Sequence, residues 1–387
     1  MAHRTELFKV PKAALLVGGV MPSQLLRWST FYKKIYKIIS FLLQFIYALC
    51  LVFFSTEIFR IAGSNTRAAA ASLKCMTFAT VIFAKLILIQ SDKMRILLVR
   101  ASKEEDRINR NHDGITFKMY SECVRYSNVT SFVIMGVITF SGAFFIIEGL
   151  SESNSDITEN NSNYSQPLRR HPVQIWFPFD KNKYYGLALS YEVFHIVGTV
   201  VYCSVTQPLV VSVMVFLKAE LKLLQHFLRN IKHNDALNTK ESLIFVVKKY
   251  QKIIEFIEEF NKSFQYIVLL EYCVTSLILA AILIDVIQGV KMQFNLSFFL
   301  VSLFQLYSLS WNANEIIIES STGLSMAILD TDWYNMNKEC TCIIQMMLLR
   351  CSKPLSISIL GIGQLTIDAA ISRTKLTYSV FSVLSTS

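Results

Sequence analysis

The chain of 387 residues is 53% hydrophobic and 17% charged, with a mean hydropathy of +0.42 and a formal net charge of +10. A soluble domain carries more charge than this, and a closed membrane barrel would show short alternating segments instead of long uncharged runs. The long uncharged runs therefore indicate an all-α, multi-pass membrane protein. The basic residues lie in loops beside these runs, so we relate the positive charge to membrane topology and expect no nucleic-acid partner.

Seven stretches are long enough to cross a bilayer as helices, which requires roughly 20 residues each. A basic segment precedes the first of them, and we expect no cleavable signal there, because the short apolar run 13–21 lacks a clear small-residue cleavage site. We predict spans at residues 38–56, 68–90, 127–147, 185–217 with a kink at Pro208, 264–287, 294–314 and 365–387.

The last span differs from the other six because it contains Asp368, Arg373 and Lys375 together with many Ser and Thr residues. A helix surrounded by lipid would be destabilised by those groups, so this helix should face protein or water along part of its circumference. It is therefore a candidate lining for a path through the membrane. One helix cannot enclose a conduit, so such a pore requires several copies around an axis.

The distribution of Lys and Arg among the loops predicts the topology. The segment before the first span and every second loop after it hold 27 basic residues, whereas the alternate loops hold 7. By the positive-inside rule the amino terminus is cytoplasmic and, after seven crossings, the carboxyl terminus is extracellular. Sequons at Asn160, Asn163 and Asn295 fall on the predicted outer side, and we expect Asn160 and Asn163 to be glycosylated.

Helical periodicity continues into the predicted cytoplasmic loops. Apolar residues recur at helical spacing from 221 to 231 and from 247 to 257, so the fourth and fifth helices should extend into the cytosol. Another helix is predicted at 337–351, ending before Pro354. We divide the chain into a cytoplasmic segment (1–37), a six-helix bundle with a ligand pocket and cytosolic extensions (38–335), and a cytosolic anchor helix followed by the seventh span (336–387).

Four sequence motifs in order carry a family resemblance. They are the Trp176-Phe-Pro-Phe-Asp180 turn before the fourth span, Tyr307–Glu315 at the end of the sixth, Asp332-Trp-Tyr334 followed by Met346–Pro354, and Ser372–Leu384 in the seventh. This series resembles that of insect odorant receptors, although Ser310 and Ala313 depart from the family's small residues. The match covers all seven spans and the predicted topology.

The resemblance implies a ligand-gated, non-selective cation channel that assembles as a heterotetramer in the plasma membrane of an olfactory neuron dendrite. The chain lacks the long insertion between the fourth and fifth spans that is typical of the co-receptor, so it resembles the variable subunit that binds the odorant and pairs with the co-receptor. In the family, the seventh helix lines the pore. The corresponding positions here are Tyr378, Phe381 and Leu384, of which Leu384 replaces a polar residue of the co-receptor.

By the same analogy, the ligand pocket should lie in the outer half of the bundle among spans two to six. The outer halves supply an apolar wall that suits a volatile, mostly apolar small molecule. We expect its residues to be Phe78, Phe140, Phe144, Tyr191, Phe194, Phe298, Phe299 and Ser302.

No motif of an enzyme is present, and no cofactor is expected. Cys340, Cys342 and Cys351 lack a His that would complete a metal site, so none is predicted. Polar residues within spans are interpreted as structural: Lys85 and Glu271 as partners or snorkelling groups, and Glu192 and His195 as a polar contact on one helical face, with ligand binding as the alternative. The competing classes are a gustatory receptor of the same channel fold, a G-protein-coupled receptor and a membrane enzyme.

Overall fold

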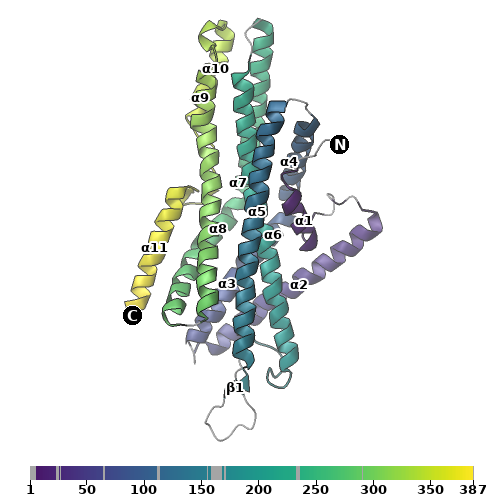
Figure 1. The fold of residues 1–387 in the computed structure, drawn as a ribbon, viewed down its shortest axis with the longest axis vertical. Helices are drawn as coiled ribbons and strands as arrows, with labels where there is room; N and C mark the ends of the chain where they lie inside the picture. Colours follow the sequence, from purple (N-terminus) through teal and green to yellow (C-terminus); the bar gives the residue numbers. More distant parts are fainter. Residues whose placement is uncertain are drawn as a thin grey trace.

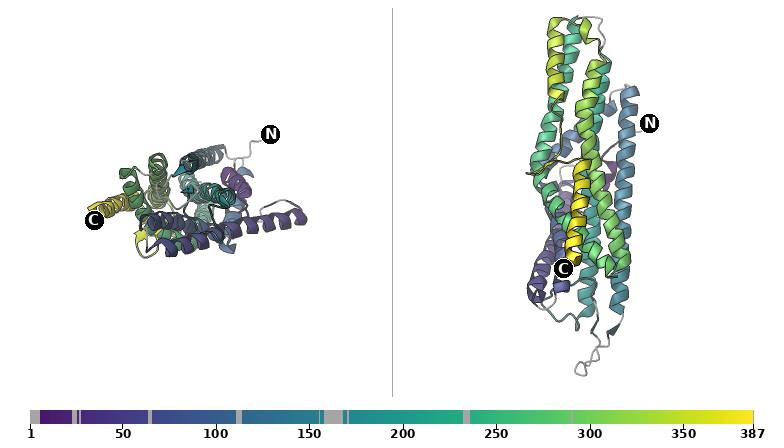
Figure 2. Two further views of the ribbon diagram at one scale, coloured as in Figure 1. Left: turned by 90° about the horizontal axis from the view of Figure 1, so that it is seen from below. Right: turned by 90° about the vertical axis from the view of Figure 1, so that its left-hand side faces the viewer.

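The computed structural model describes residues 6–22, 26, 28–63, 66–110, 114–154, 156–157, 168–169, 171–231, 236–289 and 291–386. Within these residues the chain is an elongated bundle of helices with two short hairpins (Figures 1 and 2). The helices are α1 (Lys9–Val17), α2 (Thr30–Ile61), α3 (Thr66–Gln90), α4 (Asp92–Arg110), α5 (Gly114–Asn154), α6 (Tyr185–Arg229), α7 (Ala236–Ile287), α8 (Met292–Ile318), α9 (Leu324–Leu329), α10 (Lys338–Cys351) and α11 (Ile367–Thr386). The hairpins pair β1 (Asp156–Ile157) with β2 (Leu168–Arg169), and β3 (Ser358–Ile359) with β4 (Gly363–Gln364).

Each of the seven predicted spans falls on a helix, so the all-α prediction is confirmed. Among the described residues, α2, α3, α5, α6, α7 and α8 with its continuation are long and apolar enough to cross a membrane. Helices α6 and α7 exceed their predicted spans, as the predicted cytosolic extensions require: α7 runs without interruption over 52 residues, and α6 continues through Pro208 to Arg229. The sixth span also continues past residue 314, through a π-helical turn (η1, Glu319–Gly323) into α9.

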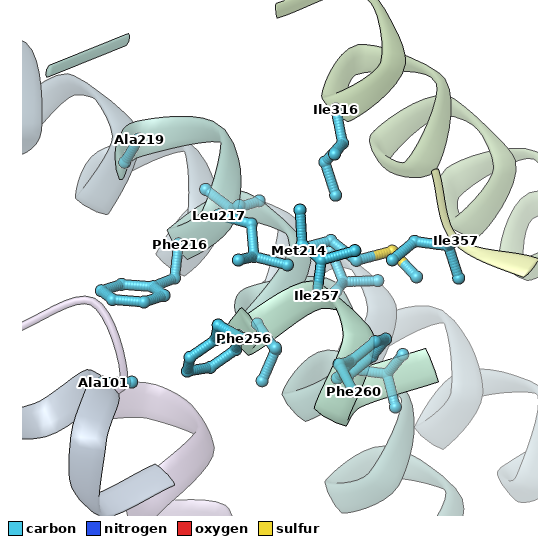
Figure 3. Packing of buried hydrophobic residues seen from close by; sticks show 14 of the residues in the cluster. Ala101, Met214, Phe216, Leu217, Ala219, Phe256, Ile257, Phe260, Ile316 and Ile357 are labelled. Carbon is cyan, nitrogen blue, oxygen red and sulfur yellow. The ribbon is translucent and has the colours of Figure 1, made fainter. Parts of the chain in front are cut away.

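Helix α6 is the centre of the bundle. Its middle portion, from Tyr202 to Leu217, is buried at every position, whereas α2 keeps most of its apolar surface exposed. A helix that is apolar on all faces can be surrounded by protein, and α5, α7, α8 and α3 pack around α6 in this way. Figure 3 shows Met214, Phe216 and Leu217 of α6 meeting Phe256 and Phe260 of α7 in this core.

Hydropathy does not predict helices α1 and α4, because α1 is short and α4 is strongly charged. Helix α4 is amphipathic, and its buried residues recur at helical spacing: Met94, Leu97, Leu98, Ala101, Glu105 and Ile108. The segment leading into α1 buries Leu7 and Phe8 completely, and the Leu7 amide donates a hydrogen bond to the Glu105 carboxylate. The amino-terminal segment is therefore packed into the bundle.

The ends of α6, α7 and α9 project beyond the other helices at one end of the bundle, together with α10 (Figure 1). Ion pairs join the helices at this end, including Lys218 of α6 to Glu315 of α8 at 2.7 Å and Arg229 of α6 to Asp330, just after α9, at 3.0 Å. The predicted helix at 337–351 is α10, and an extended segment after it leads to the β3–β4 hairpin and α11. The boundaries of the three predicted segments of the chain stay predictions.

The hairpin before α11 is attached to α7 through one asparagine. The Asn261 side chain donates to the Ser356 carbonyl at 2.8 Å and accepts from the Ser358 amide at 3.1 Å. Asn261 matches a glycosylation sequon, but this pair of hydrogen bonds gives it a structural role. The hairpin therefore fixes where the chain leaves the projecting helices and enters α11.

The opposite end of the bundle carries the loop between α5 and α6. Val173, Ile175 and Phe177 of this loop are buried against Cys50 and Phe54 of α2, so the loop closes the bundle. Nearby, the Glu148 carboxylate of α5 accepts the amides of Gln293 and Phe294 and thereby caps the start of α8. Asn160 and Asn163 lie outside the described residues, and the Asn295 side chain is buried, which corrects its use as an outer glycosylation marker.

Candidate ligand-binding site

A partly open cavity lies at the end of the bundle that carries the α5–α6 loop. Helices α3, α5, α6 and α8 form its walls, with Phe54 of α2 and Val173 of the loop. Its volume of about 110 Å³ is several times the roughly 10–15 Å³ that one water molecule needs, so it can hold a small molecule. The wall is dominated by aromatic and aliphatic side chains, among them Phe78, Phe145, Phe294 and Phe298.

A close approach between α5 and α6 shapes this cavity. A Cβ atom added at Gly142 of α5 would lie 2.3 Å from the Val200 side chain of α6, far inside van der Waals contact. Both residues line the cavity. The glycine therefore allows the two helices to meet at this level and sets the width of the cavity between them.

The structure distributes the eight residues predicted to bind ligand over several environments. Phe78 and Phe298 line the cavity and touch each other edge to face at 5.2 Å between ring centroids, and Ser302 lines a second cavity beside it. The remaining five do not line the first cavity. Phe140 and Phe194 are exposed on the outside of the bundle, Phe144 packs on Phe140, Tyr191 packs under the α5–α6 loop, and Phe299 is half-buried. Ligand contact stays a prediction for all eight, and the geometry favours Phe78, Phe298 and Ser302.

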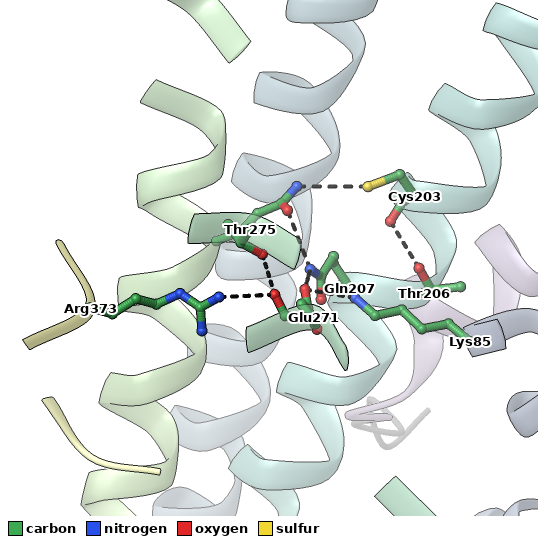
Figure 4. A network of polar contacts seen from close by, with 8 residues as sticks. Lys85, Cys203, Thr206, Gln207, Glu271, Thr275 and Arg373 are labelled. Atoms are coloured by element: carbon green, nitrogen blue, oxygen red, sulfur yellow. Dashed lines mark hydrogen bonds and ion pairs between the residues drawn. The ribbon is translucent and has the colours of Figure 1, made fainter. Parts of the chain in front are cut away.

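A buried polar cluster lies in the wall of the second cavity, which shares Phe78, Cys203, Phe298 and Gln305 with the first. Lys85 lies 2.8 Å from the Glu271 carboxylate, which also accepts from Gln207 at 2.7 Å (Figure 4). The interpretation of Lys85 and Glu271 as structural partners is confirmed by this ion pair.

The polar cluster extends from the cavity to α11. Gln207 also contacts Gln305 at 3.3 Å, and Gln305 donates to the Cys203 sulfur at 3.7 Å. On the other side, Arg373 of α11 donates to the Glu271 carbonyl at 3.2 Å (Figure 4). Gln305 is thus a cavity residue that the motifs do not reveal. A lone amide within an apolar span was its only sequence signal.

Helix α11 lies on the flank of the bundle against α7 and α8 (Figures 1 and 2). Its buried face contains Ala370, Arg373 and Thr377, and the opposite face exposes Tyr378 by 68%. Phe381 is half-buried at the border of the two faces, and the side chain of Leu384 lies outside the described part of the chain. The prediction that α11 should face protein on one side is confirmed, and the pore roles of Tyr378, Phe381 and Leu384 stay predictions.

Glu192 and His195 occupy one side of α6 but have different neighbours. The Glu192 carboxylate lies 2.9 Å from Nδ1 of His171 in the α5–α6 loop, an ion-pair distance without hydrogen-bond alignment. His195 lines the cavity and stacks on Tyr47 at 5.0 Å between ring centroids. The interpretation of Glu192 as a polar contact within the bundle is confirmed by His171, whereas for His195 the alternative of ligand binding stays open.

These features define a helical membrane protein with seven predicted spans and an internal, mostly apolar cavity near one end. The family model described as 7tm Odorant receptor matches residues 58–378, and the chain belongs to this family. Odorant receptor 10 of Aedes albopictus is 24% identical over 181 residues, a match that covers 45% of this chain and about half, 48%, of that relative.

Two solved structures share the fold over nearly the whole chain. The olfactory receptor OR5 of Machilis hrabei matches with a TM-score of 0.79 at 14% identity, covering 97% of each chain. The same receptor in complex with eugenol matches with a TM-score of 0.80 at 15% identity, covering 98% of this chain and 97% of that one. Together with the family match, these findings favour the odorant receptor prediction over the gustatory and G-protein-coupled alternatives.

Proposed function

We propose that the chain is the odorant-binding subunit of a ligand-gated, non-selective cation channel, in which a volatile, mostly apolar molecule occupies the cavity. The observation that carries this proposal is the cavity itself, which is lined by aromatic rings and can hold a small molecule. Support comes from the odorant receptor family match and from the related Machilis receptor, whose fold has been solved with eugenol bound.

The polar cluster offers a physical route from the cavity to the pore. Gln305 lines the cavity, and hydrogen bonds connect it through Gln207 and Glu271 to Arg373 on α11. A ligand shifts a conformational equilibrium only if it binds one state more tightly than the other. We infer that α11 has two positions, and that a ligand contacting Gln305 binds more tightly in one of them because the hydrogen bonds of this cluster differ between the two.

The exposed face of α11 supports a pore built from several chains. It carries Lys375, Tyr378 and Ser379, whose side chains are exposed. We infer that the partner is the odorant receptor co-receptor in a heterotetramer, since a closed ring of α11 helices would cover this face. The assembly belongs in the plasma membrane of an olfactory neuron dendrite, with the α5–α6 loop outside and glycosylated at Asn160 or Asn163.

The test is an odorant panel applied to cells that express this chain with a co-receptor. We expect inward cation current to at least one volatile apolar compound, and no such current from the co-receptor alone with the same compound. Ala at Phe78 or Phe298 should shift the response profile, whereas Ala at the exposed Phe59 of α2 should not. Normal surface expression without current to any compound in a broad panel would contradict the proposal.

A further inference from the structure

His195 differs from the other polar side chains that line the cavity. Lys74 pairs with Asp285, Ser141 contacts the Ser297 hydroxyl at 3.1 Å, and Gln305 contacts Gln207 and Cys203. His195 is 6% exposed, yet its Nδ1 atom has no hydrogen-bond partner among the described residues. A buried polar atom without a partner is costly, and His195 lines the cavity, so a ligand there that supplies a partner for Nδ1 is favoured.

Aromatic neighbours hold the imidazole ring in place. It stacks on Tyr47 at 5.0 Å with an interplanar angle of 26°, and Phe54 meets it edge on at 5.6 Å. No carboxylate forms a hydrogen bond with the ring within the described chain, and an imidazolium among aromatic rings would need such a partner. We therefore treat the ring as neutral, with one nitrogen as donor and the other as acceptor.

Thr199 determines which nitrogen accepts. The Thr199 hydroxyl donates to the His195 carbonyl at 2.8 Å, so its own hydrogen is occupied. Its oxygen lies 3.5 Å from His195 Nε2 and can accept the Nε2 hydrogen. We therefore assign the proton to Nε2, which leaves Nδ1 with a lone pair that has no partner among the described residues. A neutral ligand satisfies that lone pair only if it donates a hydrogen bond.

We propose that His195 selects odorants that carry a hydroxyl group, namely small alcohols or phenols with an otherwise apolar body. The hydroxyl donates to Nδ1 of His195, and the rings of Phe78 and Phe298 contact the apolar part. Ethers, esters and ketones of the same shape fill the same volume but bring no donor. This inference rests on the proposed function, because it names the chemical class of ligand for that cavity.

The experiment compares isomeric pairs on the chain expressed with a co-receptor: 1-hexanol with 1-methoxypentane, 2-phenylethanol with benzyl methyl ether, and 4-ethylphenol with 4-methylanisole. The measured quantity is the EC50 of the ether divided by that of its hydroxyl partner. We expect a ratio of about ten for each pair that opens the channel, which corresponds to one net hydrogen bond. The His195→Phe variant should bring the ratio to about one.

Two further variants keep the test decisive. His226→Phe makes the same replacement on α6 outside the cavity and should leave the ratio unchanged. Thr199→Val removes the oxygen that accepts from Nε2 and frees the proton to move to Nδ1, so it should lower the ratio even if His195→Phe fails to fold. An unchanged ratio in both cavity variants, or equal potency of ethers and alcohols in the natural chain, overturns the proposal. Current to ethers alone would still support the proposed function, whereas silence toward every odorant would contradict both.

Discussion

The guanidinium carbon of Arg373 lies 3.6 Å from the centroid of the Tyr272 ring, so α11 is joined to α7 by a buried cation–π contact. Arg373 is 1% exposed, and its Nε and Nη1 atoms have no hydrogen-bond partner among the described residues. The ring face is thus a main source of stabilisation for this charge.

Replacing Tyr272 with Leu should therefore destabilise the folded chain by about 2 kcal/mol, because a desolvated cation–π contact contributes that much. Tyr272→Phe keeps the ring and loses only the hydrogen bond from its hydroxyl to the Ala369 carbonyl, so it should cost less. The measurement is the melting temperature of the detergent-solubilised protein. Tyr266→Leu, at an exposed position of the same helix, serves as the control. Equal melting temperatures for the Leu and Phe variants at position 272 would contradict the prediction.

The ion pair of Lys85 and Glu271 leads to a second prediction. Removing one partner of a buried pair leaves the other charge uncompensated, at a typical cost of about 3–5 kcal/mol. Lys85→Met and Glu271→Gln should each lower the melting temperature, and the double variant should lose less than the sum of the two. Additive losses would mean that the two charges are not coupled in the folded chain.

Gly142 offers a test of the helix contact beside the cavity. Gly142→Ala places a methyl group against Val200 and should destabilise the protein by about 1–3 kcal/mol through overpacking. Adding Val200→Ala should recover much of that loss. Gly136→Ala, on the same helix with open space around its Cα, should be neutral or slightly stabilising. The measurements are surface expression and melting temperature. If Gly142→Ala changed neither, α5 and α6 could move apart at this level without loss of stability, and the prediction would be wrong.

The contact of Glu105 with the amino-terminal segment should depend on pH. Burial raises the pKa of the Glu105 carboxyl, although hydrogen bonds from the Leu7 amide and the Tyr120 hydroxyl oppose the shift. A carboxyl whose pKa is higher in the folded state holds its proton more tightly there than when unfolded. Stability is therefore lost as pH rises from the unfolded pKa through the raised folded pKa, and is constant above it.

Hydrogen exchange of the α1 amides can measure this dependence. Protection should be stronger at mildly acidic pH than at neutral pH, and Glu105→Gln should be protected at both, because the amide resembles the protonated carboxyl. Glu104→Gln, at the neighbouring and more exposed position, is the matched control. If Glu105→Gln retained the pH dependence of the natural chain, another group would be responsible.

The last prediction concerns the pore. Tyr378 is on the exposed face of α11, whereas Phe381 borders the buried face. A ring of apolar side chains can close a pore by dewetting, so small polar residues at Phe381 or Leu384 should raise basal current or alter cation permeability with little change in odorant potency. Ser at Tyr378 should have at least as large an effect, because that residue is available to neighbouring chains. Unchanged current, permeability and block in all three variants at normal surface expression would remove this helix from the pore.

Much of the architecture is determined by the sequence alone. A segment that crosses lipid has to be a long, mostly uncharged helix, and the Lys and Arg residues in the loops predict which end of each helix is cytoplasmic. The seven spans, the helix α10 before Pro354 and the partnership of Lys85 with Glu271 follow from runs, spacing and the cost of a lone charge in hydrocarbon. The family resemblance of the motifs from Trp176 to Leu384 likewise needs no coordinates.

Only the tertiary structure decided which apolar residues face the cavity. In a membrane both faces of a helix are apolar, so hydrophobic periodicity does not separate a ring that faces lipid from one that faces the interior. Phe140 and Phe194 therefore resemble Phe145 and Phe294 in the sequence, yet the first two lie outside and the other two line the cavity. The unpaired nitrogen of His195 is likewise a property of packing, because it depends on neighbours that five helices and a loop bring together.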